Sequence, residues 1–378
     1  MNRTSFRKLL APSVAVLALS ISLTACGAGN ESSADSGSDS GSSDSSDTSG
    51  GLSGDLNGAG ASSQEKAQGA WATGFQGMND GNVTVNYDPV GSGDGRTNFI
   101  NGGVSFAGSD SYLNDDEGEL SAAKERCNGT DPIEVPAYVS PIAVAFKLDG
   151  VDALNLDADT IAQIFDNKIT KWNDPAIAEQ NPSADLPDQA ITPVHRSDDS
   201  GTTKNFTDYL GKASESWSYE AEDAFPVKGG EAAEGTSGVI SAVSGGNGTI
   251  GYADESQVGD LSVVSVKVGE DYVAPSAEGA ALVVEASPAA EGRADVDMAV
   301  DIDRTTTEAG AYPVVLLSYL IACQTYEDQA EADLVKGYLS YIVSPEGQDA
   351  ASQEAGSAPL SDSVAEKAKG IVEAISAG

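Results

Sequence analysis

Three segments of the chain place glycine, serine and threonine where an apolar run ends and a helical pattern begins. They are residues 58–65, 90–95 and 195–203. Turns of this kind present free backbone N–H groups at the positive end of a helix, and their glycines let a ligand approach closely. One such turn is weak evidence, because serine and glycine cap helices in most proteins. The three turns together with one arginine, Arg196, indicate a site for an oxyanion.

Catalysis is the alternative that the same residues raise. His195, Asp198 and Ser200 lie within six residues, but the members of a hydrolase triad normally stand on separate elements, so that the imidazole can reach the hydroxyl. A phosphatase needs metal ions or a covalent nucleophile beside the anion. The chain has one His and three Cys, too few for a zinc cluster or a haem site. The sequence therefore predicts no enzyme, no cofactor and no metal site, and a phosphatase-type hydrolase is the less favoured alternative.

Composition limits the remaining classes of function. The 378 residues suffice for two domains of ordinary size, and 40% of them are hydrophobic, so a folded core is expected. The 20 Lys and Arg against 59 Asp and Glu give a net charge of −39. Nucleic-acid binding is excluded as a general function, because it needs basic side chains to replace the counterions of the phosphate backbone.

The N-terminus has the layout of a secretory signal. Three basic residues precede an apolar stretch at 9–23, which is too short for a transmembrane span. The stretch ends in Leu-Thr-Ala-Cys, which resembles the lipobox of bacterial lipoproteins. The resemblance implies that the signal peptide, residues 1–25, is removed and that the thiol of Cys26 carries a diacylglycerol. We therefore expect a protein that is anchored by lipid to the cell membrane, on its extracytoplasmic face.

The segment after the lipobox differs in composition from the rest of the chain. Residues 26–51 are rich in Ser, Gly and Asp and contain no basic residue. Such a segment cannot bury enough apolar surface to offset the entropy of ordering it, so it is expected to be a disordered tether. A flexible coil of this length has a root-mean-square reach of roughly 25–30 Å. The folded part is thus expected to remain close to the membrane.

From residue 52 onward, β-branched runs alternate with helical patterns. Strands are predicted at 83–87, 104–107, 138–146, 191–195, 250–252 and 312–322, and helices at 97–101, 160–165, 203–210 and 330–342. This alternation predicts an α/β fold with mainly parallel sheets. The folded part is large for one such sheet, so two α/β lobes are expected.

The three turns also carry motifs that resemble those of one protein family. Residues 196–202 have the pattern Arg-x-Asp-x-Ser-Gly-Thr, which resembles a motif of the phosphate-binding protein of bacterial phosphate-import (Pst) ABC transporters. Leu-x-Gly-Ala-Gly-Ala-Ser at 56–62, Gly-Ser-Gly-x-Gly at 91–95 and Phe-Ala-Gly-Ser-Asp at 106–110 follow the order of the family. The resemblance runs from about residue 52 to the C-terminus.

The resemblance implies a two-lobed fold of the type II periplasmic-binding-protein class. Lobe I would comprise residues 52–147 and 304–378, lobe II would comprise residues 148–303, and two crossing segments would form the hinge. The implied function is high-affinity binding of inorganic phosphate outside the cell and its delivery to the transmembrane permease of an ABC importer. A binding protein for another tetrahedral oxyanion, such as sulfate or molybdate, is the nearest alternative. A structural or adhesive lipoprotein would need none of the arginine turn.

The family's phosphate ligands can be carried over to matching positions of this chain. In three places this sequence departs from the family: Ser62-Ser63 replaces a common Thr-Phe, Gly93 replaces a common serine, and His195, which is given no role, stands where some members have a second basic residue. The resemblance implies that Asp198 holds the arginine. The implied phosphate ligands are Ser62, Ser63, Ser92, Asp110, Arg196, Ser200, Gly201 and Thr202.

Asp110 is an unexpected residue in an anion site, because two negative charges in a desolvated cleft repel each other. Its presence makes sense if the ligand carries a proton. Both the mono- and the dianion of phosphate have an O–H group that the carboxylate can accept, whereas sulfate has none. The sequence therefore predicts that Asp110 determines the selectivity for phosphate over sulfate.

Two cysteines remain in the exported part, Cys127 and Cys323. Export to an oxidising compartment favours a disulfide between them over two free thiols. Both are expected in the lobe that is built from the two ends of the chain.

Overall fold

The two longest apolar runs of the sequence form the central strands of the sheet. The computed structural model describes residues 51–115 and 118–378. In it, the two runs are β4 (Ile133–Lys147) and β11 (Val315–Ala322), which pair antiparallel along the whole of β11. Every residue of both strands except Lys147 is buried.

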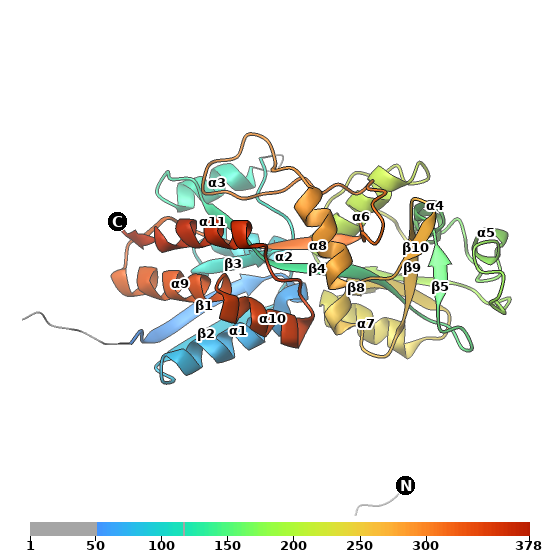
Figure 1. Ribbon diagram of the computed structural model, residues 1–378, viewed down its shortest axis with the longest axis horizontal. Helices are drawn as coiled ribbons and strands as arrows, with labels where there is room; N and C mark the ends of the chain where they lie inside the picture. Colours follow the sequence, from blue (N-terminus) through green and yellow to red (C-terminus); the bar gives the residue numbers. More distant parts are fainter. Residues whose placement is uncertain (1–50, 116–117) are drawn as a thin grey trace, which may run out of the picture. The chain divides into compact units, whose positions relative to one another are not determined.

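One group of strands and helices flanks β11 on the side away from β4. The strands follow the order β2-β1-β3-β11, and β1 runs parallel to both of its neighbours. Helices α1, α9 and α10 contact one another beside β1 and β2 (Figure 1). The elements of this group are β1 (Gly54–Gly60), η1 (Ser62–Gln64), α1 (Glu65–Met78), β2 (Val83–Asp88), α2 (Ser92–Ile100), β3 (Phe106–Ser109), α3 (Glu119–Arg126), β12 (Thr325–Tyr326), α9 (Gln329–Ile342), α10 (Pro345–Ala355), α11 (Asp362–Glu373) and β13 (Ser376–Ala377).

A second group is built on the C-terminal part of β4. That part pairs with β8 and β9, and the order continues from β8 to β6 and β7 through parallel pairs. Helix α7 packs on β8 and β6 (Figure 1). The elements of this group are β5 (Leu154–Leu156), α4 (Ala158–Phe165), α5 (Pro175–Ala178), β6 (Thr192–Arg196), α6 (Gly201–Ala213), β7 (Glu231–Ala233), α7 (Gly235–Gly245), β8 (Thr249–Asp254), η2 (Glu255–Gln257), β9 (Ser262–Val268) and β10 (Asp271–Val273).

The sheet combines parallel pairs with antiparallel pairs at its centre, although mainly parallel sheets were predicted. The pairs β1–β2, β1–β3, β8–β6 and β6–β7 are parallel, because a helix returns the chain to the same end of the sheet between successive strands. The central strands are antiparallel, because β4 leaves the first group and β11 runs back into it. The α/β fold class and the existence of each predicted strand and helix are confirmed.

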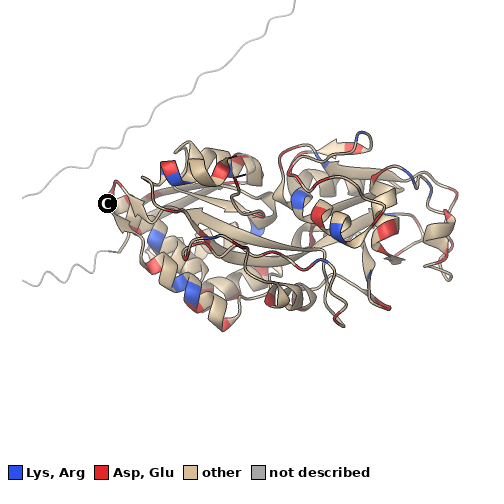
Figure 2. Cartoon of the chain, turned by 90° about the horizontal axis from the view of Figure 1, so that it is seen from above, with Lys and Arg blue, Asp and Glu red and all other residues tan. Residues whose placement is uncertain are grey.

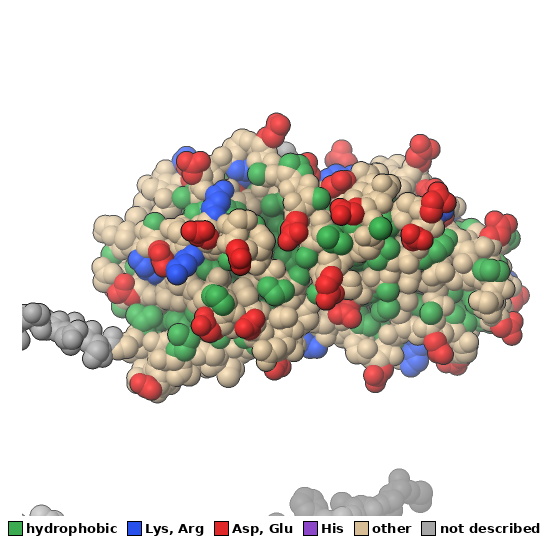
Figure 3. All heavy atoms as spheres, viewed as in Figure 1, with side chains coloured by type: hydrophobic (Ala, Val, Ile, Leu, Met, Phe, Trp, Pro, Cys, Tyr) green, Lys and Arg blue, Asp and Glu red, His purple; other side chains and the backbone are tan. Residues whose placement is uncertain are grey.

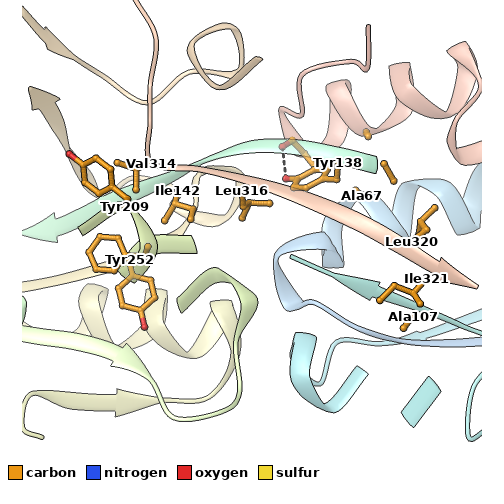
Figure 4. Close-up of a cluster of buried hydrophobic side chains, with 14 of the residues drawn as sticks. Ala67, Ala107, Tyr138, Ile142, Tyr209, Tyr252, Val314, Leu316, Leu320 and Ile321 are labelled. Atoms are coloured by element: carbon orange, nitrogen blue, oxygen red, sulfur yellow. Dashed lines mark hydrogen bonds between the residues drawn. The ribbon is translucent and has the colours of Figure 1, made fainter. Parts of the chain in front are cut away.

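Apolar side chains of β4 and β11 form the core that the two groups share. Figure 4 shows one buried cluster along the two strands, from Tyr209 and Tyr252 at one end to Leu320 and Ala107 at the other. Helix α8 (Ala277–Ala286) packs on the opposite side of the same strands. Residues 50–378 form one compact unit, so the division into lobes at 147/148 and 303/304 stays a prediction.

The predicted disulfide between Cys127 and Cys323 is confirmed. It joins the end of α3 to the end of β11, where both cysteines are fully buried and their Cα atoms are 5.2 Å apart. The signal peptide, Cys26 and nearly all of the tether lie outside the described residues. No helix in the described part of the chain is long and apolar enough to span a membrane.

Candidate anion-binding site

Asp110 follows β3 and is the centre of the site. The residue is only 3% exposed. The Ser63 hydroxyl donates to both of its carboxylate oxygens, at 2.7 and 2.8 Å, and the Thr202 hydroxyl donates to Oδ2 at 2.9 Å. The Ser318 hydroxyl, from β11, donates to Oδ1 at 2.6 Å. Three hydroxyls from three separate elements therefore surround one buried carboxylate.

The N-termini of α2 and α6 meet at the backbone of Asp110. The Asp110 N–H donates to Ser92 Oγ at 3.1 Å, and the Asn205 side chain donates to the Asp110 carbonyl at 2.6 Å. A side chain at Gly201 would bring its Cβ within 2.7 Å of Ser92 Oγ and 2.8 Å of Asp110 Cβ. Glycine is therefore required at position 201 for the two helices to approach this closely.

Arg196 lies at the end of β6, with 2% of its side chain exposed. Its Nε donates to Asp198 Oδ1 at 2.7 Å, and its terminal nitrogen pairs with Oδ2 of the same carboxylate. The Gly235 N–H also donates to Asp198, at 3.0 Å. Burial acts to raise the pKa of Asp198, but these hydrogen bonds and the charge of Arg196 outweigh it and lower that pKa. Asp198 is therefore an anion whose two carboxylate oxygens hold two nitrogens of the Arg196 guanidinium and so fix its orientation.

Ser200 and Ser62 contact helix N-termini rather than the Asp110 carboxylate. Ser200 Oγ accepts a hydrogen bond from the Thr203 N–H at 3.2 Å and so caps α6. Ser62 Oγ accepts one from the Thr236 N–H at 3.1 Å, in the first turn of α7. The structure thus brings all of the predicted ligands to one place, where three helices begin.

The pKa of Asp110 is raised above its usual value. Burial is the main cause, and the hydroxyls of Ser318, Ser63 and Thr202 and the charge of Arg196 act against it. Each of these groups stabilises the ionised carboxylate. Burial therefore outweighs three hydroxyl hydrogen bonds and the charge of Arg196 in setting the pKa of this carboxylate.

His195, Asp198 and Ser200 do not form a triad. The two ring nitrogens of His195 contact the carbonyls of Arg196, at 2.8 Å, and Gly229, at 3.2 Å. The ring stacks on Phe225, with the centroids 4.4 Å apart. In this arrangement the imidazole cannot activate the Ser200 hydroxyl, which leaves no basis for the hydrolase alternative in these residues.

Arg96 forms a second buried network next to Asp110. It donates to Ser109 Oγ at 3.1 Å and Ser111 Oγ at 2.8 Å, on the two sides of that residue. It also pairs with Glu119, at 2.8 Å, and with Asp223. Because Asp223 lies in the segment after α6, this ion pair joins α2 to the second group of elements.

A cavity of about 210 Å³ adjoins Asp110. Lys204, Asp208, Lys212 and Arg304 line it, but Arg196 and the other predicted ligands do not. No cluster of three or more His, Cys, Asp or Glu that could hold a metal ion occurs among residues 51–115 and 118–378.

Acidic side chains are spread over the surface that the figures show. Figure 3 shows acidic side chains over the whole visible face, and Figure 2 shows them on both groups of elements. Within the site, the buried Arg196 and the converging helix N-termini can attract an anion.

Comparisons with known proteins show to which family the chain is similar. The model of the PBP superfamily domain matches residues 43–346. The phosphate-binding protein PstS2 of Mycobacterium bovis (strain BCG / Pasteur 1173P2) is 34% identical over 359 residues, which are 94% of this chain and 95% of that protein. The chain belongs to the PstS family. The phosphate-binding protein PstS of Pasteurella multocida, also 34% identical, covers 70% of the chain with 74% of its own length.

A solved structure extends the comparison to the fold. The periplasmic phosphate-binding protein PfluDING, solved with bound phosphate, aligns with a TM-score of 0.69 at 23% identity. The alignment covers 84% of this PstS-family chain and 93% of the other. The fold is therefore that of the type II periplasmic binding proteins, as predicted.

Four residues of the site were not predicted from the sequence: Ser318, Asn205, Thr236 and Arg96. Ser318 had a detectable signal, because it is a small polar residue inside an apolar run and a buried hydroxyl needs a partner. Asn205 and Thr236 occupy ordinary positions near helix N-termini, and only the tertiary fold brings them to Asp110 and Ser62.

Proposed function

We propose that this PstS-family protein binds inorganic phosphate outside the cell and delivers it to the permease of a phosphate ABC importer. The observation that carries the proposal is the buried Asp110 carboxylate, which lies among hydroxyl donors and helix N-termini beside Arg196. An anion site that contains a carboxylate suits a protonated anion. The names of the curated relatives support the same ligand.

The proposed ligands divide into two functions. Arg196 and the N-termini of α2, α6 and α7 attract any oxyanion, so they supply affinity. Asp110 accepts the O–H of phosphate in a charge-assisted hydrogen bond, which is about twice as strong as a neutral one. Sulfate offers the same carboxylate only acceptors, and the repulsion is not compensated. The proposed ligand set is Ser62, Ser63, Ser92, Asp110, Arg196, Ser200, Gly201 and Thr202.

Closure is part of the proposal. Residues 52–147 and 304–378 would form one lobe and residues 148–303 the other, and the chain would cross between them near Lys147 and near Asp303. The hydrogen bond from Thr202 to the Asp110 carboxylate would then be a contact between the lobes, whereas the bond from Ser63 would lie within the first lobe. We propose binding without chemical conversion of the anion, since the ring nitrogens of His195 are held by two backbone carbonyls.

Calorimetric titration of the mature protein with phosphate and with sulfate tests the function. We expect saturable binding of one phosphate and weak or no binding of sulfate. Asp110→Asn, which keeps the size of the side chain and adds an N–H donor, should lower phosphate affinity modestly and allow sulfate to bind. A parent that prefers sulfate would contradict the proposal, and a variant that rejects sulfate as strongly as the parent would contradict the assignment of Asp110.

We propose that the diacylglycerol on Cys26 anchors the protein to the extracytoplasmic face of the cell membrane. The Leu-Thr-Ala-Cys sequence supports this proposal. Cys26→Ala removes the acylated thiol, so the protein should move from the membrane fraction to the soluble or secreted fraction. Immunoblotting of the fractions measures the change, with Cys127→Ala/Cys323→Ala as a control that keeps the anchor. Unchanged membrane association of Cys26→Ala would show that the anchor is wrong.

A further inference from the structure

A chain of four buried side chains ends at Asp110. Tyr338 OH donates to Gln68 Oε1 at 2.8 Å, and Gln68 Nε2 donates to Gln64 Oε1 at 2.8 Å. Gln64 Nε2 then donates to Ser318 Oγ at 2.5 Å, and the Ser318 hydroxyl donates to Asp110 Oδ1 at 2.6 Å. All four side chains are at most 1% exposed. None of them belongs to the proposed ligand set.

The hydrogen bonds of this chain all run in one direction. The Gln64 amide also donates to the carbonyl of Tyr319, at 3.3 Å. Because a carbonyl can only accept, this contact fixes which end of the Gln64 amide is the nitrogen, and so fixes the orientation of Gln68. Burial raises the pKa of Tyr338 well above its usual value, so its hydroxyl keeps its proton and donates. Every donor in the chain therefore points towards Asp110.

A β-bulge of β4 lies opposite Ser318. Ser318 lies opposite Tyr138 of β4, but the next residue, Tyr319, lies opposite Pro136, so Ala137 is the extra residue. Bulges turn a strand locally and re-aim a side chain. Here the bulge coincides with the one hydroxyl of β11 that reaches the carboxylate.

Ser318 differs from the other two hydroxyls on Asp110. Ser63 and Thr202 belong to the proposed ligand set, and their hydroxyls can rotate towards phosphate when it arrives. The oxygen of Ser318 accepts the Gln64 amide, and this contact holds the hydroxyl in the position from which it donates to Asp110. Ser318 is therefore the donor that stays on the carboxylate when the ligand is bound.

We propose that Ser318, held by Gln64, is a positioning residue for phosphate selectivity: it keeps Asp110 an acceptor and so reserves that carboxylate for the proton of the ligand. The inference rests on the proposed function and adds a selectivity determinant outside the ligand set. A protonated Asp110 would donate a hydrogen bond and would no longer reject sulfate. Loss of the Ser318 hydroxyl should favour that form.

Other charged groups around Asp110 are the same in the parent and in the variants below. Arg196 of β6, Asp254 of β8 and Tyr87 of β2 act on it electrostatically. Burial raises the pKa of Asp254 to about 7, so this group titrates within the range of the test. The adjoining cavity adds Lys204, Lys212, Arg304, Asp208 and Asp301.

The test compares phosphate and sulfate affinities from pH 5 to pH 8.5 in the parent and in Ser318→Ala. Because the variant raises the pKa of Asp110, the acceptor form is lost at a higher pH as the solution is acidified. We expect the pH at which selectivity for phosphate falls to move up by about one unit, the size expected for one hydrogen bond to a charged group. At a fixed acidic pH the ratio of the two affinities should fall about tenfold.

Three further variants separate this effect from a general loss of stability. Ser318→Thr keeps the hydroxyl and should restore the parent profile. Gln64→Met removes the donor that holds Ser318 and should shift the profile in the same direction as Ser318→Ala. Ser214→Ala is the matched control, since Ser214 is a buried serine that donates to a different carboxylate, Asp159, at 2.5 Å. It should have no effect on the profile.

A readout without ligand keeps this inference distinct from the proposed function. Carbon-13 NMR of the Asp110 carboxyl, assigned by its loss in Asp110→Asn, should titrate at a higher pH in Ser318→Ala than in the parent. A parent that bound no phosphate would refute the proposed function, while the NMR titration would still decide the role of Ser318. Coincident titration curves in parent and variant, or an equal shift in Ser214→Ala, would overturn the inference.

Discussion

Replacing Arg196 with methionine is expected to weaken phosphate binding roughly a hundredfold or more. Removing one partner of a buried, hydrogen-bonded charge pair costs about 2–5 kcal/mol. Here the side chain is 2% exposed, and its charge acts on Asp110, the carboxylate proposed to select the ligand. Methionine keeps much of the apolar volume, so the loss reflects the missing charge and the missing N–H donors. Calorimetric titration with phosphate measures the change.

The variant leaves Asp198 without its guanidinium, so stability needs a separate control. In Arg196→Met/Asp198→Asn the unpaired charge is removed, and stability should recover while binding stays weak. Arg126→Met provides a second control. The guanidinium carbon of Arg126 lies 5.4 Å from the centroid of the Phe99 ring, and the residue is outside the proposed site. Near-parental phosphate affinity in Arg196→Met would show that the helix N-termini alone hold the anion.

Removing the disulfide should cause the largest loss of stability. Cys127→Ala/Cys323→Ala opens a loop closed across a sequence separation of 196 residues. Native disulfides of exported proteins typically contribute about 2–5 kcal/mol, and the chain-entropy model gives about 5 kcal/mol for a loop of this length. Denaturant unfolding measures the loss. Phosphate affinity should change little, because neither cysteine contacts a proposed ligand.

Reductant provides the control for the disulfide prediction. It should lower the unfolding midpoint of the parent towards that of the double variant, and it should leave the double variant unchanged. Equal midpoints of the parent and the double variant without reductant would contradict the prediction. A large drop in phosphate affinity would show that the bond also supports the site.

The sequence predicted those parts of the fold whose pattern is local. The apolar runs of β4 and β11 were predicted as strands because little else can bury a continuous run of that kind. The direction of those strands was not predicted, since pairing depends on where the chain returns. Helix α7 was also missed, because its residues are mostly Gly, Ser, Val and Ala and give a weak pattern.

For the site too, the sequence predicted the residues with local motifs and missed those that only the tertiary fold places there. The glycine and serine turns were identified by their local motifs, and the structure brings them together around Asp110. Ser318 contacts the same carboxylate, yet it has no motif of its own. It lies opposite a bulge that shifts the pairing of two distant strands by one residue. A single sequence gives no direct signal of such a shift.

The disulfide also decides what a cut in the chain would do. Cys127 and Cys323 close a covalent ring that contains every residue between them. The segment between α6 and β7, with Lys228 exposed, lies inside that ring. A protease that cut there would release no fragment, because the piece before the cut holds one cysteine and the piece after it holds the other. A nicked molecule outside a reducing compartment would therefore remain one covalent unit, and the damage would become visible only after reduction.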